Sequence, residues 1–243
     1  MISIVIPVYN QADKIGKCLK SILDQTYANV EVVIVNDGSV DNIGEVVREY
    51  EAQFEEHNPT PILARGRPGF KVINQENHGA NHARNRGESE ASGEYVIFCD
   101  ADVVMRPDML ETMLNALEET PQASYVYSSF YWGKKLFKLW PFDPEKLKQM
   151  PCIHTTSLMR RGHFQGFDMK IRRFQDWDLF LTMLESGYRG MWIDKPLFTV
   201  ATDGFQSMSS WLPSFAYKYL KFLPAVKKYN RAISLVKEKH KLL

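Results

Sequence analysis

Two aspartates one residue apart, Asp100 and Asp102, are the side chains of this sequence best placed to do chemistry. They come directly after the apolar stretch 95–99, whose composition is typical of a short buried strand. In an extended chain, side chains two residues apart point the same way, so both carboxylates can face one ligand. Two hard oxygen donors suit a divalent cation such as Mg²⁺ or Mn²⁺, which usually serves a phosphate. The structural alternative is an acidic pair that caps a helix or occupies a solvated turn.

The segments that must position this pair alternate between strand and helix patterns. The predicted strands are 2–8, 30–35, 71–74 and 95–99, and the predicted helices are 12–25, a helix capped by Asp41, and 79–90. This order predicts an α/β fold with a mostly parallel sheet and helices on both faces. Right-handed crossovers bring the carboxyl ends of the strands to one edge, where such sheets bind ligands. The polar residues that follow the strands should therefore meet there: Tyr9, Asn10, Asn36, Asp37, Asn77 and the aspartate pair.

The second half of the chain mixes strands and helices less regularly. A helix follows Pro107, and further segments are predicted as strands at 124–132, 155–160 and 197–201 and as a helix at 176–186 closed by Gly187. Beyond Ser214, apolar residues recur in steps of four and three, which predicts an amphipathic helix that Pro224 splits or kinks. We therefore expect one domain over 1–210 and a basic amphipathic helical tail over 211–243.

Composition excludes several classes of protein. A net charge of +1 argues against a nucleic-acid binder, although residues 215–243 carry eight Lys or Arg and one Glu. This tail can bind an anionic membrane surface, pack on its own domain, or pair with a second copy in a homodimer.

Three cysteines without paired spacing make neither a disulfide framework nor a zinc site. We see no signal peptide and no apolar stretch long enough to span a membrane, so we expect a cytoplasmic protein, with peripheral contact at the inner face of the cell membrane if the tail binds lipid.

Several motifs occur in a fixed order along the chain. They are 6–10 (IPVYN), 35–39 (VNDGS), 77–87 (NHGANHARNRG), 100–102 (DAD), 166–168 (GFD) and 175–179 (QDWDL). Together they resemble the family 2 glycosyltransferases, which have the GT-A fold, over about residues 2–200. The resemblance implies transfer of a sugar from a nucleotide-sugar donor, usually a UDP-sugar, to a glycan or lipid-linked acceptor, with inversion at the anomeric carbon. In such a fold 1–105 would bind the nucleotide and 106–210 the acceptor.

The resemblance also assigns roles around the nucleotide. Asp102 would bind Mn²⁺ or Mg²⁺, while Asp100 would touch the ribose or the metal. The residues that would contact the nucleotide are Pro7, Tyr9, Asp37, Asn77, Gly79, Arg84, Asp100 and Ala101. For Asp37 the roles considered are recognition of the base, which we favour, and capping of the following turn. Arg84 would contact the diphosphate or, as we slightly prefer, hold its loop against Asp100.

The acceptor chemistry would rest on Asp176. In the family the general base is the aspartate of a Glu-Asp pair, which here reads Gln175-Asp176. Gln175 and Trp177 would face the acceptor, with a core position as the alternative for the tryptophan ring and a helix cap as the alternative for Asp176.

A third metal ligand is missing from the expected place. Relatives often carry a His before a final Ser-x-Ser, but the segment here, 201–209, contains none. Asp203 could substitute, and His154 and His163 are further candidates, each better explained by a structural role.

Other functions fit less well. A nucleotidyltransferase needs a glycine-rich basic loop after the first strand, and a NAD-dependent oxidoreductase needs Gly-x-Gly-x-x-Gly there, and neither is present. A non-catalytic sugar-nucleotide-binding protein on a decayed transferase fold remains the alternative, although Asp102 and Asp176 are both intact.

Overall fold

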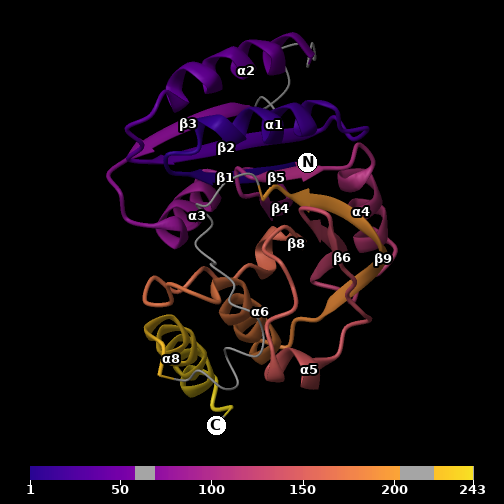
Figure 1. Cartoon of the computed structure of the whole chain (residues 1–243). Helices are drawn as coiled ribbons and strands as arrows, with labels where there is room; N and C mark the ends of the chain where they lie inside the picture. Colours follow the sequence, from indigo (N-terminus) through magenta and orange to yellow (C-terminus); the bar gives the residue numbers. More distant parts are fainter. Residues whose placement is uncertain (58–68, 203–221, 243) are drawn as a thin grey trace.

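The computed structural model describes residues 1–57, 69–202 and 222–242 (Figure 1). The elements, in chain order, are β1 (Ile2–Val8), α1 (Ala12–Leu23), β2 (Val30–Asp37), α2 (Ile43–His57), β3 (Phe70–Gln75), α3 (Ala80–Ser89), β4 (Tyr95–Phe98), β5 (Val103–Met105), α4 (Met109–Glu118), β6 (Tyr125–Trp132), β7 (Lys135–Phe137), α5 (Pro144–Gln149), β8 (Leu158–Arg160), η1 (Arg161–His163), α6 (Gln175–Glu185), β9 (Gly190–Val200) and α8 (Pro224–Lys239). Asp203 and the expected boundary at 210 and 211 lie outside the described residues.

The first half of the sheet is parallel, as predicted. Its strands run in the order β3-β2-β1-β4, and the register pairs Val8 with Asn36 and Asp37 with Gln75. Helices α1 and α2 cover one face and α3 covers the other (Figure 1). All seven residues of β1 are buried, because this strand is covered on both faces. The carboxyl ends of the four strands therefore share one edge, where the expected site residues follow them.

The second half of the sheet is mixed and curled. Beyond β4 the order is β8-β6-β9-β5, in which β6 and β9 are parallel and the β4–β8, β6–β8 and β5–β9 pairs are antiparallel. The register of β6 with β9 shifts around Ser129. This curl returns β5 to α1, where the Met105 amide donates to Ser21 Oγ at 3.1 Å. The sheet is thus mostly parallel only in its first half.

Two strand lengths differ from expectation. The strand expected over 155–160 is confined to Leu158–Arg160, because the preceding residues turn: the Thr156 amide donates to His154 Nδ1 and Ser157 Oγ donates to the His154 carbonyl. The last strand begins at Gly190, well before the expected 197, and it pairs along the whole of β6.

A buried carboxylate ties three segments together at the opposite edge of the sheet. Glu31 accepts hydrogen bonds from Ser3 Oγ, from Ser92 through both its amide and its hydroxyl, and from the Gly93 amide. Burial alone would raise the pKa of Glu31, but these donors lower it below its ordinary value. This contact lies at the amino ends of β1 and β2, away from the expected site.

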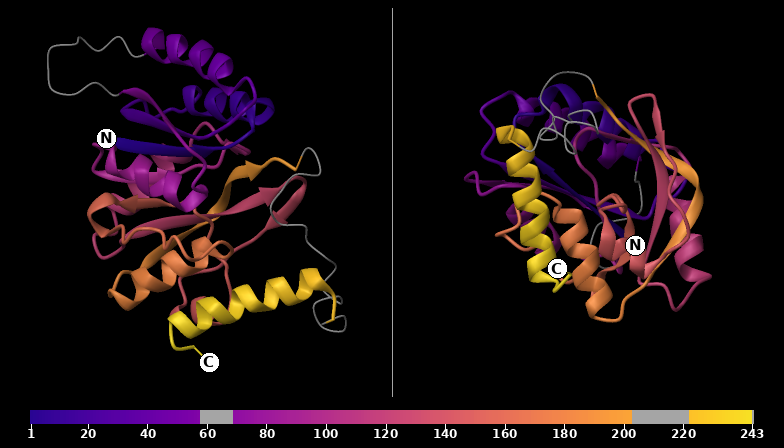
Figure 2. Two further views of the ribbon diagram at one scale, coloured as in Figure 1. Left: turned by 90° about the vertical axis from the view of Figure 1, so that its left-hand side faces the viewer. Right: turned by 60° about the horizontal axis from the view of Figure 1, so that its bottom comes forward.

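The C-terminal helix α8 begins at Pro224, in the first helical position that tolerates proline. Its Val226 and Val236 are fully buried, and α8 lies alongside α6 in all views (Figures 1 and 2). Of the three partners considered for the tail, its own domain therefore covers the apolar face of the described part. No helix in the described ranges combines the length and apolar character that a membrane crossing requires.

Candidate active site

Asp37 organises the loop that follows β3. Its Oδ1 accepts from the His78 amide at 2.9 Å and from Gln75 Nε2 at 2.7 Å, and its Oδ2 accepts from the Gly79 amide at 2.8 Å. Asp37 is buried, so its carboxylate holds the backbone of this loop. This is a capping role, the alternative that the sequence left open, although the cap is on the loop after β3 rather than on the following turn.

The same loop leaves room for a ligand. Gly79 has a φ of +92°, which favours glycine, and no atom lies within 4 Å of where its Cβ would be. Asn77 is exposed beside it. Both residues are therefore available at the carboxyl edge.

Arg84 connects the two halves of the candidate site. Its Nη2 donates to Asp100 Oδ1 at 2.7 Å, its Nη1 donates to Gln175 Oε1 at 3.2 Å, and its guanidinium lies 5.2 Å from the centre of the Phe167 ring. Arg84 is buried, so the structure gives it the holding role against Asp100. Burial would raise the pKa of Asp100, but the charges of Arg84 and His154 bring it below its ordinary value.

Asp102 lies in a different electrostatic setting. Burial and the neighbouring charge of Asp100 raise the pKa of Asp102 to about 6. Lys14, in the first turn of α1, opposes this rise. Few positive charges near Asp102 balance its carboxylate. A divalent cation could supply that positive charge, with Asp100 as a second oxygen donor. Among the described residues, no group of three or more His, Cys, Asp or Glu side chains could hold a metal.

Asp176 lies at the start of α6. Its Oδ1 accepts from the Trp177 amide at 2.8 Å, and burial raises its pKa while the charges of His154 and Arg84 oppose that rise. A carboxylate with a raised pKa binds a proton more readily near neutral pH, which suits a general base.

The His154 ring feels the charges of both Asp100 and Asp176. Its Nδ1 accepts from the Thr156 amide, so the neutral ring carries its proton on Nε2. The ring contacts Phe130 and Phe198 with centroids 5.3 and 5.2 Å away, and burial lowers the pKa of His154 while the charges of Asp100 and Asp176 act against this. His163, the other candidate, stacks on Tyr188 instead.

Several assignments need correction. The Trp177 ring is only 1% exposed and its Nε1 donates to the Leu147 carbonyl at 2.6 Å, so it is a core residue that no acceptor can stack on. Pro7 is buried within β1 and Ala101 is fully buried, so neither side chain is open to a nucleotide, whereas Tyr9 is exposed. Asp41 Oδ2 accepts from the Ala12 amide at 2.9 Å, and therefore caps α1 rather than α2.

Sequence reasoning missed Lys14. A cation in the first turn of a helix is disfavoured by the helix dipole, so a lysine there was a signal of a nearby anionic group.

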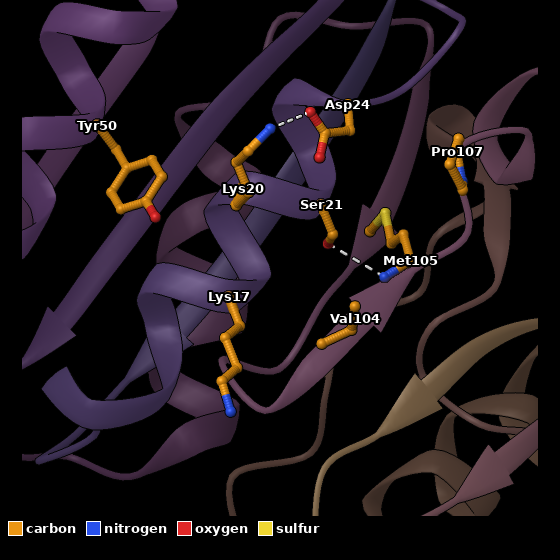
Figure 3. Close-up of a pocket in the computed structure, with 8 residues that line it drawn as sticks. All are labelled: Lys17, Lys20, Ser21, Asp24, Tyr50, Val104, Met105 and Pro107. Carbon is orange, nitrogen blue, oxygen red and sulfur yellow. Dashed lines mark hydrogen bonds and ion pairs between the residues drawn. The ribbon is translucent and has the colours of Figure 1, made fainter.

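A separate hollow lies between α1, α2 and β5 (Figure 3). It has a volume of about 400 Å³ between α1, α2 and the β5 region, and it is lined by Lys17, Lys20, Ser21, Asp24, Tyr50, Val104, Met105 and Pro107. None of the expected site residues lines it. Lys20 pairs there with Asp24.

Residues 3–176 match the profile of glycosyl transferase family 2. The chain belongs to this family. The glycosyltransferase GlyA of Streptococcus pneumoniae is 39% identical over 130 residues, which cover 54% of this chain and 17% of GlyA. The chain aligns with less than half the length of each of the first relatives it matches.

Solved structures share the fold of this family 2 chain. S. aureus TarS 1-349 in complex with UDP-GlcNAc superposes with a TM-score of 0.72 at 18% identity, over 93% of this chain and 66% of TarS. The mannosyltransferase PcManGT from Pyrobaculum calidifontis, in complex with GDP-Man and Mn²⁺, gives 0.65 at 21% identity, over 84% of this chain and 58% of PcManGT. The GT-A fold expected from the sequence is therefore confirmed.

Proposed function

We propose that this protein is an inverting glycosyltransferase that transfers a sugar from a nucleotide-sugar donor, with a UDP-sugar favoured, to a hydroxyl of a glycan or lipid-linked acceptor. The observation that supports it best is the link from Asp100 through Arg84 to Gln175, because these two hydrogen bonds join the aspartate after β4 to the first residue of α6. TarS and PcManGT, which share the fold, were crystallised with UDP-GlcNAc and with GDP-Man and Mn²⁺.

The donor would lie along the carboxyl edge of the parallel strands. Gly79 and Asn77 allow its close approach, and the exposed ring of Tyr9 offers a surface for the base or ribose. Asp37 shapes this slot through the loop it holds. Lys14 would add positive charge near the diphosphate.

Asp102, with Asp100 beside it, would hold Mn²⁺ or Mg²⁺. A divalent cation bound there supplies positive charge that stabilises the departing nucleoside diphosphate. Arg84 keeps Asp100 ionised and in place, because its guanidinium pairs with that carboxylate in a buried setting.

Asp176 would accept the proton of the acceptor hydroxyl as that oxygen attacks the anomeric carbon from the face opposite the leaving group. Arg84 donates a hydrogen bond to Gln175, the residue before Asp176, as well as to Asp100. One side chain therefore orients both the general base and the aspartate pair. His154, whose Nδ1 accepts from the Thr156 amide, would donate a hydrogen bond from Nε2 to the sugar.

The test measures nucleotide release from UDP-GlcNAc, UDP-glucose and GDP-mannose with a panel of acceptors, alongside calorimetric binding of UDP with Mn²⁺. We expect Asp176→Asn to lower kcat by at least about 100-fold, the scale of general base catalysis, and to leave UDP affinity unchanged. We expect Asp102→Asn to lose the Mn²⁺-dependent part of UDP binding.

The matched control is Asp194→Asn, because Asp194 is an exposed aspartate paired only at 3.5 Å with Lys138. Full turnover in Asp176→Asn would exclude this residue as the base. UDP binding without release from any donor, in the presence of every acceptor tried, would favour the non-catalytic alternative.

A further inference from the structure

Helix α8 and the start of α6 are joined by a buried ionic cluster. Asp178, which is 2% exposed, contacts Lys239 Nζ through Oδ1 at 2.7 Å and through Oδ2 at 2.9 Å, and His240 Nε2 lies 2.9 Å from its Oδ1. The other ring nitrogen of His240, Nδ1, lies 2.8 Å from Glu185 Oε1. A buried carboxylate with two cationic partners fixes the relative position of the two helices.

The same lysine reaches a second segment. Lys239 Nζ lies 3.0 Å from Asp168 Oδ2, in the loop that precedes α6. That loop is also fastened to α3, because Asn81 Nδ2 donates to the carbonyls of Asp168 and Ile171 at 2.7 and 2.9 Å. Lys239 therefore joins the loop before α6 to the first turn of α6.

A third contact lies immediately before the base. Phe174 has a left-handed backbone, with a φ of 59°, and its ring packs edge-on against Tyr229 of α8 with centroids 5.2 Å apart. Phe174, the N-cap residue of α6, provides no side-chain cap, although Asp176 Oδ1 accepts from the Trp177 amide in the first turn. The residues that α8 contacts, Asp168, Phe174 and Asp178, thus lie on both sides of Gln175 and Asp176 in the sequence.

We propose that α8 holds the start of α6 in its working position, and that Lys239 and His240 are positioning residues for Asp176. This inference rests on the proposed function, because it assigns the tail a role in the chemistry of Asp176. A helix end without a side-chain cap frays readily unless tertiary contacts fix it, and α8 supplies those contacts. A small displacement of the base is costly, since catalysis depends on the distance between the reacting atoms.

The test compares Lys239→Met with Lys239→Arg and with Lys228→Met in the full chain. Lys239 is 33% exposed, and Lys239→Arg keeps its charge beside Asp178. Lys228 is an exposed lysine of the same helix. Hydrogen exchange at 166–178 reports on position without any substrate. Release of UDP from UDP-GlcNAc and binding of UDP with Mn²⁺ report on function.

We expect Lys239→Met to speed exchange at 172–178 by about tenfold, and to lower kcat by about tenfold with KM and UDP affinity nearly unchanged. Lys239→Arg should restore both, and Lys228→Met should change neither. Unchanged exchange at 172–178 in Lys239→Met would overturn the proposal, as would a loss of UDP affinity equal to the loss of kcat. If the unaltered protein releases no nucleotide from any donor of the panel, the proposed function fails, and the exchange result alone decides the role of α8.

Discussion

Gly87 allows α3 to pack closely on the parallel sheet, and its replacement by alanine gives a sharp test of how α3 is seated. A Cβ at this position would lie 2.4 Å from Val5 Cγ1 and 3.1 Å from Val35 Cγ2, whereas ordinary contact begins at 3.4 Å. Helix α3 would therefore have to move away from β1 by about 1 Å, because the interior leaves no room for the extra methyl. The same helix carries Arg84.

The expected magnitude follows from two opposing effects. Alanine in a helix is favoured over glycine by about 1 kcal/mol. Overpacking of a core costs about 1–3 kcal/mol, and a contact this short belongs at the upper end. We therefore expect Gly87→Ala to destabilise the protein by about 2 kcal/mol, which lowers Tm by about 4–8 °C for a chain of this size.

Thermal unfolding of four variants measures this effect. Gly44→Ala is the matched control, since its Cβ would meet only Arg48 Nη2 at 3.8 Å in α2, and it should raise Tm slightly. Val5→Ala removes the clashing methyl, so Gly87→Ala should cost at least about 1 kcal/mol less in that background than alone. Release of UDP should fall in Gly87→Ala, because a shift of about 1 Å stretches the 2.7 Å bond from Arg84 to Asp100 beyond hydrogen-bonding distance.

Two results would refute this reasoning. A Tm for Gly87→Ala equal to that of Gly44→Ala would mean that α3 accommodates the methyl without moving. Additive costs in the double variant would mean that Val5 is not what the new methyl meets.

Two further substitutions test groups away from the metal edge. Glu31→Gln should destabilise the protein by about 2–3 kcal/mol at neutral pH, because an amide cannot accept all the donors that surround the buried carboxylate. Since the pKa of Glu31 is lowered in the folded protein, its stabilising contribution should be present above about pH 4.3 and disappear as the pH falls. If the unaltered protein and Glu31→Gln lose stability equally in acid, this prediction is wrong. Burial would lower the pKa of His240, but its bonds to Asp178 and Glu185 raise it overall, with Lys239 as the neighbouring cation. The stabilising contribution of His240 should therefore be complete below about pH 6.5 and lost as the pH rises through its folded pKa. The difference in Tm between the unaltered protein and His240→Leu should shrink toward about pH 9, and a constant difference would contradict this.

The sequence predicted the parallel half of the fold well. Continuous β-branched runs such as Ile2–Val8 mark strands buried on both faces, and the polar residues after them reach one edge by topology alone. The strand β5 was missed because three residues carry no detectable period, and its place depends on pairing with β9, almost one hundred residues later. Local pattern does not encode such a partner.

The individual residues of the candidate site could be predicted from the sequence more readily than the contacts between them. Asp102 and Asp176 could be named from motif and position, and the contact of Arg84 with Asp100 was the preferred expectation. The second bond of Arg84, to Gln175, depends on packing that spacing does not specify. Trp177 shows the limit most clearly, because an aromatic residue beside a base fits either a sugar face or a core. Its hydrogen bond to Leu147, 30 residues away, decides between them.

The Glu31 carboxylate has a consequence for the aspartate pair at the other end of the strands. It receives donors from Ser3 at the start of β1 and from Ser92 and Gly93 just before β4, so it fixes how far each strand slides along its neighbour. A slip of one residue in β4 would turn every side chain of that strand to the opposite face. Asp100 and Asp102, which follow β4, would then be presented on the opposite face of the sheet. Glu31 therefore fixes the register of these strands, so the face of the sheet that carries the acidic pair is set by contacts at the opposite edge.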